Sequence, residues 1–311
     1  MRQVKWTGVY PAVTTKFTPN GDLDIPTFLK NIEFQVEAGV DGMVIGGSLG
    51  ESSTLTHQER LVLVEATLAA VGDRIDVILN VAEGATRKAI ELVKAAEKLG
   101  VHGLMLLPPM LYKPTEQEVA DYFKDVATST HLPIMLYNNP VDYKIEVTIG
   151  IFEQLMQLSN IQAVKESTRD ISNVTRMRNR FGDRFKILCG VDTLAMEELL
   201  MGADGWVAGL VDAFPRETVA VYRLVKAGRI EEALRIYRWF LPILELDINP
   251  QLVQNIKLAE VMTGIGTEYV RAPRHILVGA ERERVIGILE KGLATRPELP
   301  EYLSINVAEY A

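Results

Sequence analysis

The feature that most constrains the fold of this 311-residue sequence is an alternation of short apolar, strand-like runs with amphipathic helical stretches. The alternation occurs eight times between Val9 and Ala227. Strands are predicted at Val9–Thr15, Gly42–Gly46, Ile75–Val81, Gly103–Leu107, Pro133–Tyr137, Ile161–Lys165, Phe185–Cys189 and Gly205–Ala208. Helices are predicted at Ile25–Ala38, Thr56–Val71, Thr86–Leu99, Glu116–Ala127, Thr148–Leu158, Asn173–Phe181, Thr193–Met201 and Glu217–Ala227. Strands that alternate with helices, without a Gly- or Ser-rich linker, predict one α/β domain with a parallel sheet.

Eight such units favour a closed (β/α)₈ barrel, the TIM barrel, over an open doubly wound sheet. An open sheet of that kind needs a Gly-rich phosphate-binding turn after its first strand. The turn that follows Val9–Thr15 is Lys16-Phe17-Thr18-Pro19-Asn20-Gly21, which has no such pattern. The barrel is therefore the predicted architecture.

After the eighth unit the pattern changes to helices alone, at Ile230–Leu246, Gln251–Met262 and Glu281–Leu293. We expect residues 1–228 to form the barrel and residues 229–311 to form a C-terminal helical extension packed on it, within a single structural domain. The apolar stripes of these helices must be buried against the barrel or against another subunit, and the sequence leaves this choice open.

Composition excludes several classes of partner. Lys plus Arg number 33 against 41 Asp plus Glu, a net charge of −8 without a basic cluster, which argues against nucleic acid and anionic membranes. The four histidines lack metal-ligand spacing, and the single cysteine, Cys189, cannot form an internal disulfide. The N-terminal residues contain no apolar signal core, and no run is long enough to span a membrane. We expect a soluble, cytoplasmic protein without a metal.

Lys165 is the first candidate for chemistry, because it ends the apolar run Ile161–Lys165 and is followed by polar residues. A lysine that loses hydration at a barrel mouth has a lower pKa, and its neutral amine can attack a carbonyl. Taken alone, Lys165 is more simply interpreted as a solvated lysine just beyond a strand end. The side chains predicted beside Lys165 favour the catalytic interpretation instead.

Two further strand ends supply those side chains, since the active sites of such barrels lie at the carboxyl ends of the strands. Alternation along the strands assigns Lys165 and Tyr137 each to one face of its own strand. If both faces point inward, the two side chains share the mouth of the barrel. The turn Gly46-Gly47-Ser48-Leu49-Gly50 offers backbone N–H groups suited to a carboxylate. An amine, a phenol and a carboxylate-binding turn together indicate imine chemistry on a 2-oxo acid. Taken individually, the turn is more typical of a tight connection, and the tyrosine is more typical of a barrel wall.

The sequence also resembles a known family at these motifs. Gly47-Ser48-Leu49-Gly50-Glu51, Tyr137-Asn138-Asn139-Pro140 and Val164-Lys165-Glu166-Ser167, in this order, resemble the dihydrodipicolinate synthase / N-acetylneuraminate lyase superfamily, whose members are class I, Schiff-base-forming barrels. The resemblance extends over essentially the whole chain.

The resemblance implies a role for each matched residue. Lys165 is the lysine that forms the imine with pyruvate or a related 2-oxo acid, and Tyr137 relays protons. Ser48 and Leu49, with Gly47 in the same turn, bind the substrate carboxylate, and Leu49 contributes only its backbone N–H. Val207 contacts the bound keto acid through its backbone. The family implies no dissociable cofactor and no metal, and it implies a homo-oligomer, usually a tetramer built as a dimer of dimers.

Two departures from the family pattern bear on the reaction. The synthases have a Tyr-Tyr pair after the fourth strand, whose second tyrosine joins the relay of a neighbouring subunit, whereas this chain has Pro108-Pro109-Met110-Leu111-Tyr112-Lys113-Pro114 with Tyr112 one place along. The synthases also place an arginine after the Tyr-Asn-x-Pro motif, where this chain has Val141-Asp142-Tyr143-Lys144. We therefore expect a non-synthase member that acts on a hydroxylated 2-oxo acid or a cyclic imine derived from one.

The sequence leaves the reaction itself open. An aldolase, a dehydratase and a deaminase, for example of a hydroxypyrroline carboxylate, share imine formation and differ in the bond that breaks next. Dihydrodipicolinate synthase activity is less favoured. A keto-acid-binding regulatory barrel is an alternative outside enzymes, although such a protein has no chemical need for Lys165 and Tyr137. A phosphate-binding barrel isomerase ranks lower, because no Gly-rich cluster follows the last two strands.

Overall fold

The computed structural model describes residues 3–110 and 112–307 of the chain, so predictions that concern residues 1–2, 111 and 308–311 lie outside the described residues. The strands are β1 Gly8–Pro11, β2 Gly42–Ile45, β3 Asp76–Val81, β4 Gly103–Leu106, β5 Ile134–Asn138, β6 Ile161–Glu166, β7 Lys186–Cys189 and β8 Gly205–Ala208. The helices are α1 Ile25–Glu37, α2 His57–Val71, α3 Thr86–Leu99, α4 Glu116–Thr128, α5 Pro140–Tyr143, α6 Ile149–Leu155, α7 Ser172–Phe181, α8 Ala195–Leu200, α9 Pro215–Lys226, α10 Ile230–Leu244, α11 Leu252–Met262 and α12 Gly279–Ala294. Four short 3₁₀ helices are η1 Ser52–Thr54, η2 Asp192–Leu194, η3 Leu210–Asp212 and η4 Tyr302–Ser304.

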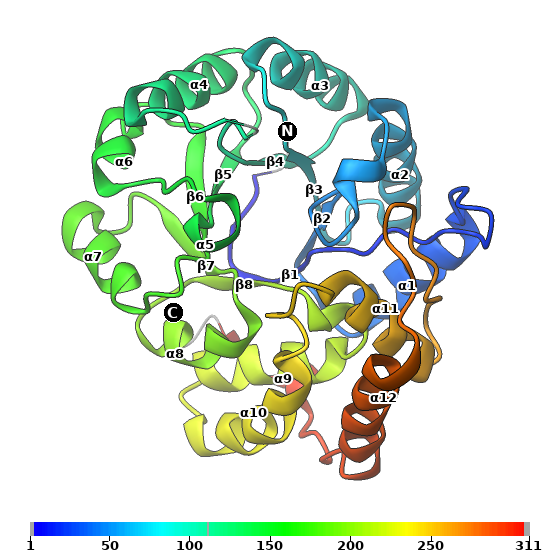
Figure 1. Cartoon of the computed structure of the whole chain (residues 1–311). Coiled ribbons are helices and arrows are strands. Elements are labelled where there is room, and N and C mark those ends of the chain that lie inside the picture. The colour runs from blue at the N-terminus through cyan, green and yellow to red at the C-terminus, as the bar shows by residue number, and fades with distance from the viewer. Residues whose placement is uncertain (1–2, 111, 308–311) are drawn as a thin grey trace.

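The eight strands form one parallel sheet in the order β1-β8-β7-β6-β5-β4-β3-β2, with the helices around it (Figure 1). A parallel bridge between Ala12 and Val44 joins the β1 end of the sheet to β2 and brings the ring almost to closure. Seven of the eight strands are buried at every residue or at all but the first, and β6 is interrupted only at Gln162. Such continuous apolar strands are expected where helices cover one face and the barrel core fills the other. The predicted (β/α)₈ barrel is confirmed.

The first strand is shorter than predicted. It ends at Pro11, and beyond it Ala12 forms the bridge with Val44 while the Val13 N–H donates to the Val44 carbonyl at 3.0 Å. The backbone N–H of Thr14 donates to Asp212 Oδ2 at 3.0 Å, and the hydroxyl of Thr15 donates to the carbonyl of Gly50 at 2.6 Å. Thr14 and Thr15 therefore bond to the loops at the barrel mouth, and their β-favouring character goes with their burial.

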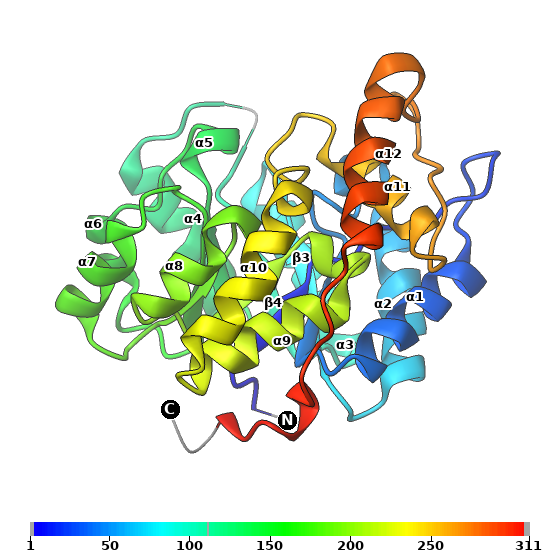
Figure 2. The ribbon, with the colours of Figure 1, turned by 90° about the horizontal axis from the view of Figure 1, so that it is seen from below.

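The helical extension lies along one flank of the barrel and reaches its mouth (Figure 2). Helix α10 packs against α9, α12 packs against α10 and α11, and α11 contacts η3 after β8. The tail then runs down to η4 at the opposite end of the barrel (Figure 2). Among the described residues, no helix combines the length and the apolar character that crossing a bilayer needs.

Candidate active site

A small cavity of about 90 Å³ opens at the carboxyl ends of the strands. Its volume lies below the roughly 300–1,000 Å³ of pockets for drug-sized ligands, so it suits a small metabolite. Loops after β2, β5, β6 and β8 and the end of α10 contribute its walls. The lining residues are Ala12, Gly47, Ser48, Leu49, Met105, Tyr137, Asp142, Tyr143, Lys165, Arg169, Gly209, Asp247, Ile248 and Leu252.

Lys165 and Tyr137 meet in this cavity, as the alternation along their strands predicts. They are direct partners in the parallel register of β6 and β5, and both side chains point into the barrel mouth. The Nζ atom of Lys165 lies 4.3 Å from the centroid of the Tyr137 ring. Both residues are buried, with 7% of each exposed. An amine and a phenol therefore share one water-poor site.

Burial sets the protonation of both groups. It lowers the pKa of Lys165, and the acidic groups of Tyr143 and Asp247 offset only part of this effect. Burial also raises the pKa of Tyr137 to about 12, which keeps the phenol protonated near neutral pH. The Nδ2 group of Asn139 donates a hydrogen bond to the Tyr137 hydroxyl at 3.1 Å. The pair thus combines an amine with an increased neutral fraction and a phenol able to donate a proton.

The Gly47-Ser48-Leu49 turn forms another part of the cavity wall. Its shape depends on Gly50, where an added Cβ would lie 2.8 Å from the carbonyl oxygen of Val13. Backbone hydrogen bonds from Glu51 to Ser48 (3.1 Å) and from Ser52 to Gly47 (3.1 Å) close the turn. All three residues of the turn line the cavity, so the structure brings them together with Lys165.

Val207 lies deeper than the other candidates. It is a buried residue of β8, 1% exposed and paired with Tyr10 of β1, and it is not among the residues that line the cavity. Gly209, two residues further along, lines the cavity in its place. A contact between the Val207 backbone and a substrate stays a prediction.

Three charged residues and one tyrosine of the cavity were not predicted as site residues. Asp142 and Tyr143 belong to the short helix α5, where the sequence indicates only a loop after Asn139-Pro140. The helix begins with Asn139 as N-cap and Pro140 in its first turn, a start signal that the sequence contains. Arg169 follows β6, and Asp247 follows α10 of the extension. No pattern in the sequence indicates that Asp247 lies at the barrel mouth.

The Asp247 carboxyl packs directly against Gly209. A Cβ added to Gly209 would lie 2.6 Å from Asp247 Oδ1, so the close approach requires glycine. Burial raises the pKa of Asp247 to about 8, and the nearby carboxylate of Asp192 adds to this rise. Asp192 itself accepts hydrogen bonds from Trp206 Nε1 (2.9 Å) and the Leu210 N–H (2.7 Å). Asp247 is therefore a second acid beside Lys165.

Glu51, at the end of the Gly47–Glu51 turn, lies outside the cavity lining. Its side chain is fully buried beneath the turn and forms an ion pair with Lys257 of α11, at 2.5 Å. The backbone N–H of Arg271 donates to the same carboxylate at 3.1 Å, and the Arg274 guanidinium lies at 3.7 Å. Glu51 also adopts a left-handed backbone conformation, with φ of 57°, which is uncommon for a residue other than glycine. The extension thus anchors the end of the Gly47–Glu51 turn.

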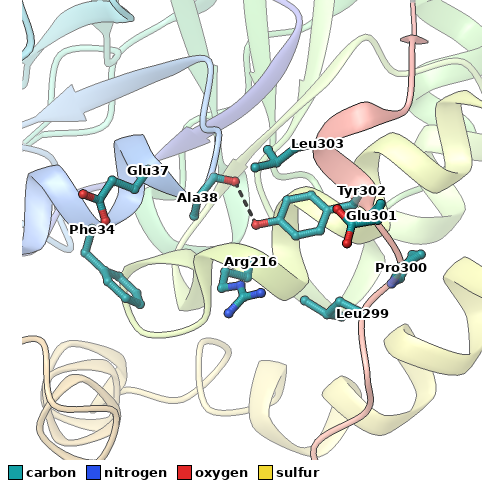
Figure 3. A pocket seen from close by; sticks show the side chains of 9 residues that line it. All are labelled: Phe34, Glu37, Ala38, Arg216, Leu299, Pro300, Glu301, Tyr302 and Leu303. Atoms are coloured by element: carbon teal, nitrogen blue, oxygen red, sulfur yellow. Dashed lines mark hydrogen bonds between the residues drawn. The ribbon is translucent and has the colours of Figure 1, made fainter.

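A larger cavity of about 370 Å³ lies at the other end of the barrel, between α1, the start of α9 and the tail (Figure 3). The Tyr302 hydroxyl donates to the Ala38 carbonyl at 3.2 Å across it (Figure 3). Its lining contains no lysine, histidine or cysteine. This cavity marks where the tail docks, and Lys165 and Tyr137 are absent from it.

Tyr112, after β4, lies outside the cavity of its own chain. Tyr112 is 51% exposed and does not line the cavity, while Leu111 beside it lies outside the described residues. Within the described part of the chain, no cluster of three or more His, Cys, Asp or Glu side chains has an arrangement that could hold a metal ion.

Comparison with known proteins gives one family for this site and fold. The sequence profile described as the Dihydrodipicolinate synthetase family matches residues 5–291. The 4-hydroxy-tetrahydrodipicolinate synthase of Moorella thermoacetica is 32% identical over 280 residues, which cover 90% of this chain and 95% of that protein.

Solved structures agree with the sequence match. The 4-hydroxy-tetrahydrodipicolinate synthase of Methylacidiphilum fumariolicum SolV superposes with a TM-score of 0.88 at 30% identity, covering 98% of this chain and 99% of that one. A chloride-inhibited dihydrodipicolinate synthase from Acinetobacter baumannii, complexed with pyruvate, superposes with a TM-score of 0.88 at 26% identity, covering 93% and 99%.

Proposed function

We propose a function from one premise: the chain belongs to the dihydrodipicolinate synthetase family of class I, Schiff-base-forming lyases. Lys165 forms an imine with the carbonyl carbon of a small 2-oxo acid, and Tyr137 transfers protons to and from the reacting atoms. The observation that carries this proposal is the buried Lys165 amine, 4.3 Å from the centroid of the Tyr137 ring in a cavity of about 90 Å³. Desolvation at this depth disfavours the charged form of the Lys165 amine and leaves its lone pair available for attack on a carbonyl.

The first step is an addition followed by a dehydration. The lone pair of neutral Lys165 forms the N–C2 bond, the carbonyl π pair moves to oxygen, and that oxygen takes a proton from Tyr137. The Tyr137 phenolate takes a proton from the nitrogen, and the restored phenol protonates the C2 hydroxyl, which leaves as water while the nitrogen lone pair forms the C=N bond of the protonated imine. Tyr137 suits the donor role because its raised pKa keeps the phenol protonated.

The carboxylate of the substrate binds the Gly47-Ser48-Leu49 turn, through backbone N–H groups and the Ser48 hydroxyl. Gly209, directly after β8, lines the cavity as well, and we propose that the substrate also contacts the backbone of Val207. The covalent lysine supplies the electron sink that a dissociable cofactor or metal supplies elsewhere, so we propose that neither is needed.

For the substrate, we favour a hydroxylated 2-oxo acid that undergoes aldol cleavage or dehydration, with deamination of a cyclic imine 2-carboxylate as the nearest alternative. Two acidic side chains, Asp142 and Asp247, line the cavity beyond Lys165. Asp247 has a raised pKa of about 8 and can donate a proton to a departing hydroxyl or amine.

The synthase reaction is the second candidate, and two observations favour it. The named relatives are 4-hydroxy-tetrahydrodipicolinate synthases. Arg169 also lines the cavity, so a guanidinium is available for a second carboxylate although none follows the Tyr137-Asn138-Asn139-Pro140 motif.

The test is a panel of substrates given to the purified enzyme. Release of pyruvate, loss of water and release of ammonia are measured with hydroxylated 2-oxo acids and hydroxypyrroline carboxylates, and condensation is measured with pyruvate and aspartate semialdehyde. Turnover in the first group with no condensation supports the favoured reading. If condensation of pyruvate with aspartate semialdehyde is the fastest reaction, the enzyme is a synthase and the favoured proposal is wrong.

We also propose a cytoplasmic homo-oligomer, with a tetramer built as a dimer of dimers as the expected form. Ile276 and Val278 of the extension support a partner, because they are 40% and 70% exposed on the flank that the extension forms. Sedimentation at micromolar concentration should give a multiple of the 34.6 kDa chain, and a single 34.6 kDa species would contradict the assembly.

A further inference from the structure

We propose that Tyr143 is a second catalytic phenol, supplied by the same chain as Lys165, which exchanges protons with the reacting centre through Ser48. This inference rests on the proposed imine chemistry and adds a residue to it. Tyr143 lines the cavity together with Lys165, Tyr137 and Ser48, and its hydroxyl is hydrogen-bonded to the Ser48 hydroxyl.

The two phenols are packed as a unit. The rings of Tyr137 and Tyr143 meet edge to face, with centroids 5.6 Å apart and planes at 81°. Burial raises the pKa of Tyr143 well above its ordinary value, so this phenol is also protonated near neutral pH. Lys165 lies beside both phenols, since its Nζ atom is 4.3 Å from the centroid of the Tyr137 ring and its side chain lines the cavity together with Tyr143.

One amide positions both phenols. Asn139 Nδ2 donates to the Tyr137 hydroxyl at 3.1 Å and to Asp142 Oδ2 at 2.8 Å, while Asn139 Oδ1 accepts the Asp142 backbone N–H at 3.1 Å. Asn139 is thereby the N-cap of α5, which begins at Pro140 and ends after Tyr143 with Lys144 in the left-handed region. The four-residue helix turns Tyr143 back over the cavity toward Ser48. Tyr112 does not take this place within its own chain, where it is 51% exposed and outside the cavity lining.

The step assigned to this pair is proton transfer at C3 of the imine. A proton leaves C3, the C3–H electron pair forms the C2=C3 bond, and the π pair of the protonated imine returns to nitrogen, which gives the enamine. The Ser48 hydroxyl takes the C3 proton as it passes its own proton to the Tyr143 hydroxyl, which gives its proton to water at the cavity mouth, and the reverse sequence returns a proton from water to C3 and regenerates the imine. In heavy water, the same cycle places deuterium on C3 of pyruvate without any other substrate.

The experiment compares Tyr143→Phe with a matched control, Tyr112→Phe, in the full-length protein. The change to phenylalanine keeps the ring contact with Tyr137 and removes only the hydroxyl. Two readouts are taken with pyruvate: the endpoint yield of the borohydride-reduced adduct on Lys165, and the rate of C3 deuterium exchange by NMR. We expect Tyr143→Phe to retain the adduct and to lose exchange by roughly 10²- to 10⁴-fold, while Tyr112→Phe matches the wild type in both.

Exchange at the wild-type rate in Tyr143→Phe overturns the inference while leaving the imine proposal intact. Absence of the adduct in the wild type overturns the imine proposal instead, so the two failures are distinguishable. A mixture of Lys165→Ala and Tyr143→Phe chains tests whether the phenol acts within one chain. Recovery of exchange in the mixture would place the phenol of one subunit in the site of another, against our proposal, and no recovery supports it.

A double-mutant cycle separates a relay from independent contacts. If Ser48 and Tyr143 act as one unit, Ser48→Ala combined with Tyr143→Phe loses about as much exchange as the worse single variant. Losses that multiply would show that the two hydroxyl groups work separately and would contradict the relay.

Discussion

Removing the buried ammonium of Lys257 should destabilise the protein strongly and loosen the carboxylate-binding turn. Lys257 and Glu51 have fully buried side chains and pair at 2.5 Å, and Lys257 Nζ also donates to the Tyr269 carbonyl at 2.7 Å. Lys257→Met keeps most of the volume of the side chain and leaves the Glu51 carboxylate buried. Breaking a buried pair by removing one partner costs about 3–5 kcal/mol.

The remaining partners of Glu51 place the expected cost toward the lower end of that range. The Arg271 N–H at 3.1 Å and the Arg274 guanidinium at 3.7 Å still face the carboxylate after the substitution. We therefore expect Lys257→Met to lower the free energy of unfolding by about 3 kcal/mol. Because Glu51 ends the Gly47–Glu51 turn, KM for the 2-oxo acid should rise as well.

Equilibrium unfolding in urea at one protein concentration measures this loss. Lys94→Met is the matched control, since Lys94 pairs with Glu97 at 3.0 Å on the surface with 49% of its side chain exposed. Exposed pairs contribute about 0–1 kcal/mol. The double variant Glu51→Gln, Lys257→Met should recover part of the loss, because it no longer buries an unpaired charge. A loss in Lys257→Met no larger than that in Lys94→Met would refute the reasoning.

Three further predictions concern single side chains. Tyr137→Phe should slow turnover by roughly 10²- to 10⁴-fold with little change in stability, and an unchanged kcat would mean that another group moves the protons. Gly209→Ala should raise KM, because the new Cβ would lie 2.6 Å from Asp247 Oδ1, whereas the control Gly287→Ala, with no atom within 4 Å of the new Cβ, should leave KM unchanged. Burial, and next the charge of Glu166, raise the pKa of Glu198 from 4.5 to about 8, so the folded state keeps a proton that the unfolded chain releases and stability falls as the pH rises through this interval. Glu198→Gln should therefore gain stability over the wild type between pH 4.5 and 8 in urea titrations, and a constant difference would contradict the assignment.

The barrel and the Lys165–Tyr137 pair follow from local patterns in the sequence. The strands are apolar, short and regularly spaced, so their number and order are readable without tertiary information. Alternation along two consecutive strands is enough to predict that Lys165 and Tyr137 face the same mouth, and the register of β5 and β6 confirms that they are partners. The Ser48–Leu49 turn is also local, because its glycines fix it.

The residues that were missed depend on contacts distant in sequence. Asp247 enters the cavity only because α10 packs on α9 and ends beside β8. The partner of Glu51 is Lys257, 206 residues further along the chain, and no pattern near Glu51 indicates it. Tyr143 is different, since Asn139 and Pro140 form a helix-start signal that the sequence contains. The short helix after the Tyr137 motif was therefore predictable, whereas the buried charges beneath the turn were not.

The most direct test of the account is to trap the imine. The wild type and Lys165→Ala are incubated with pyruvate, reduced with borohydride, digested and analysed by peptide mass spectrometry. The account predicts a reduced pyruvate adduct on Lys165 in the wild type and none on any lysine of Lys165→Ala. An adduct that persists in Lys165→Ala, or the absence of any adduct in a wild-type enzyme that turns over its 2-oxo acid substrate, would contradict the central role of Lys165.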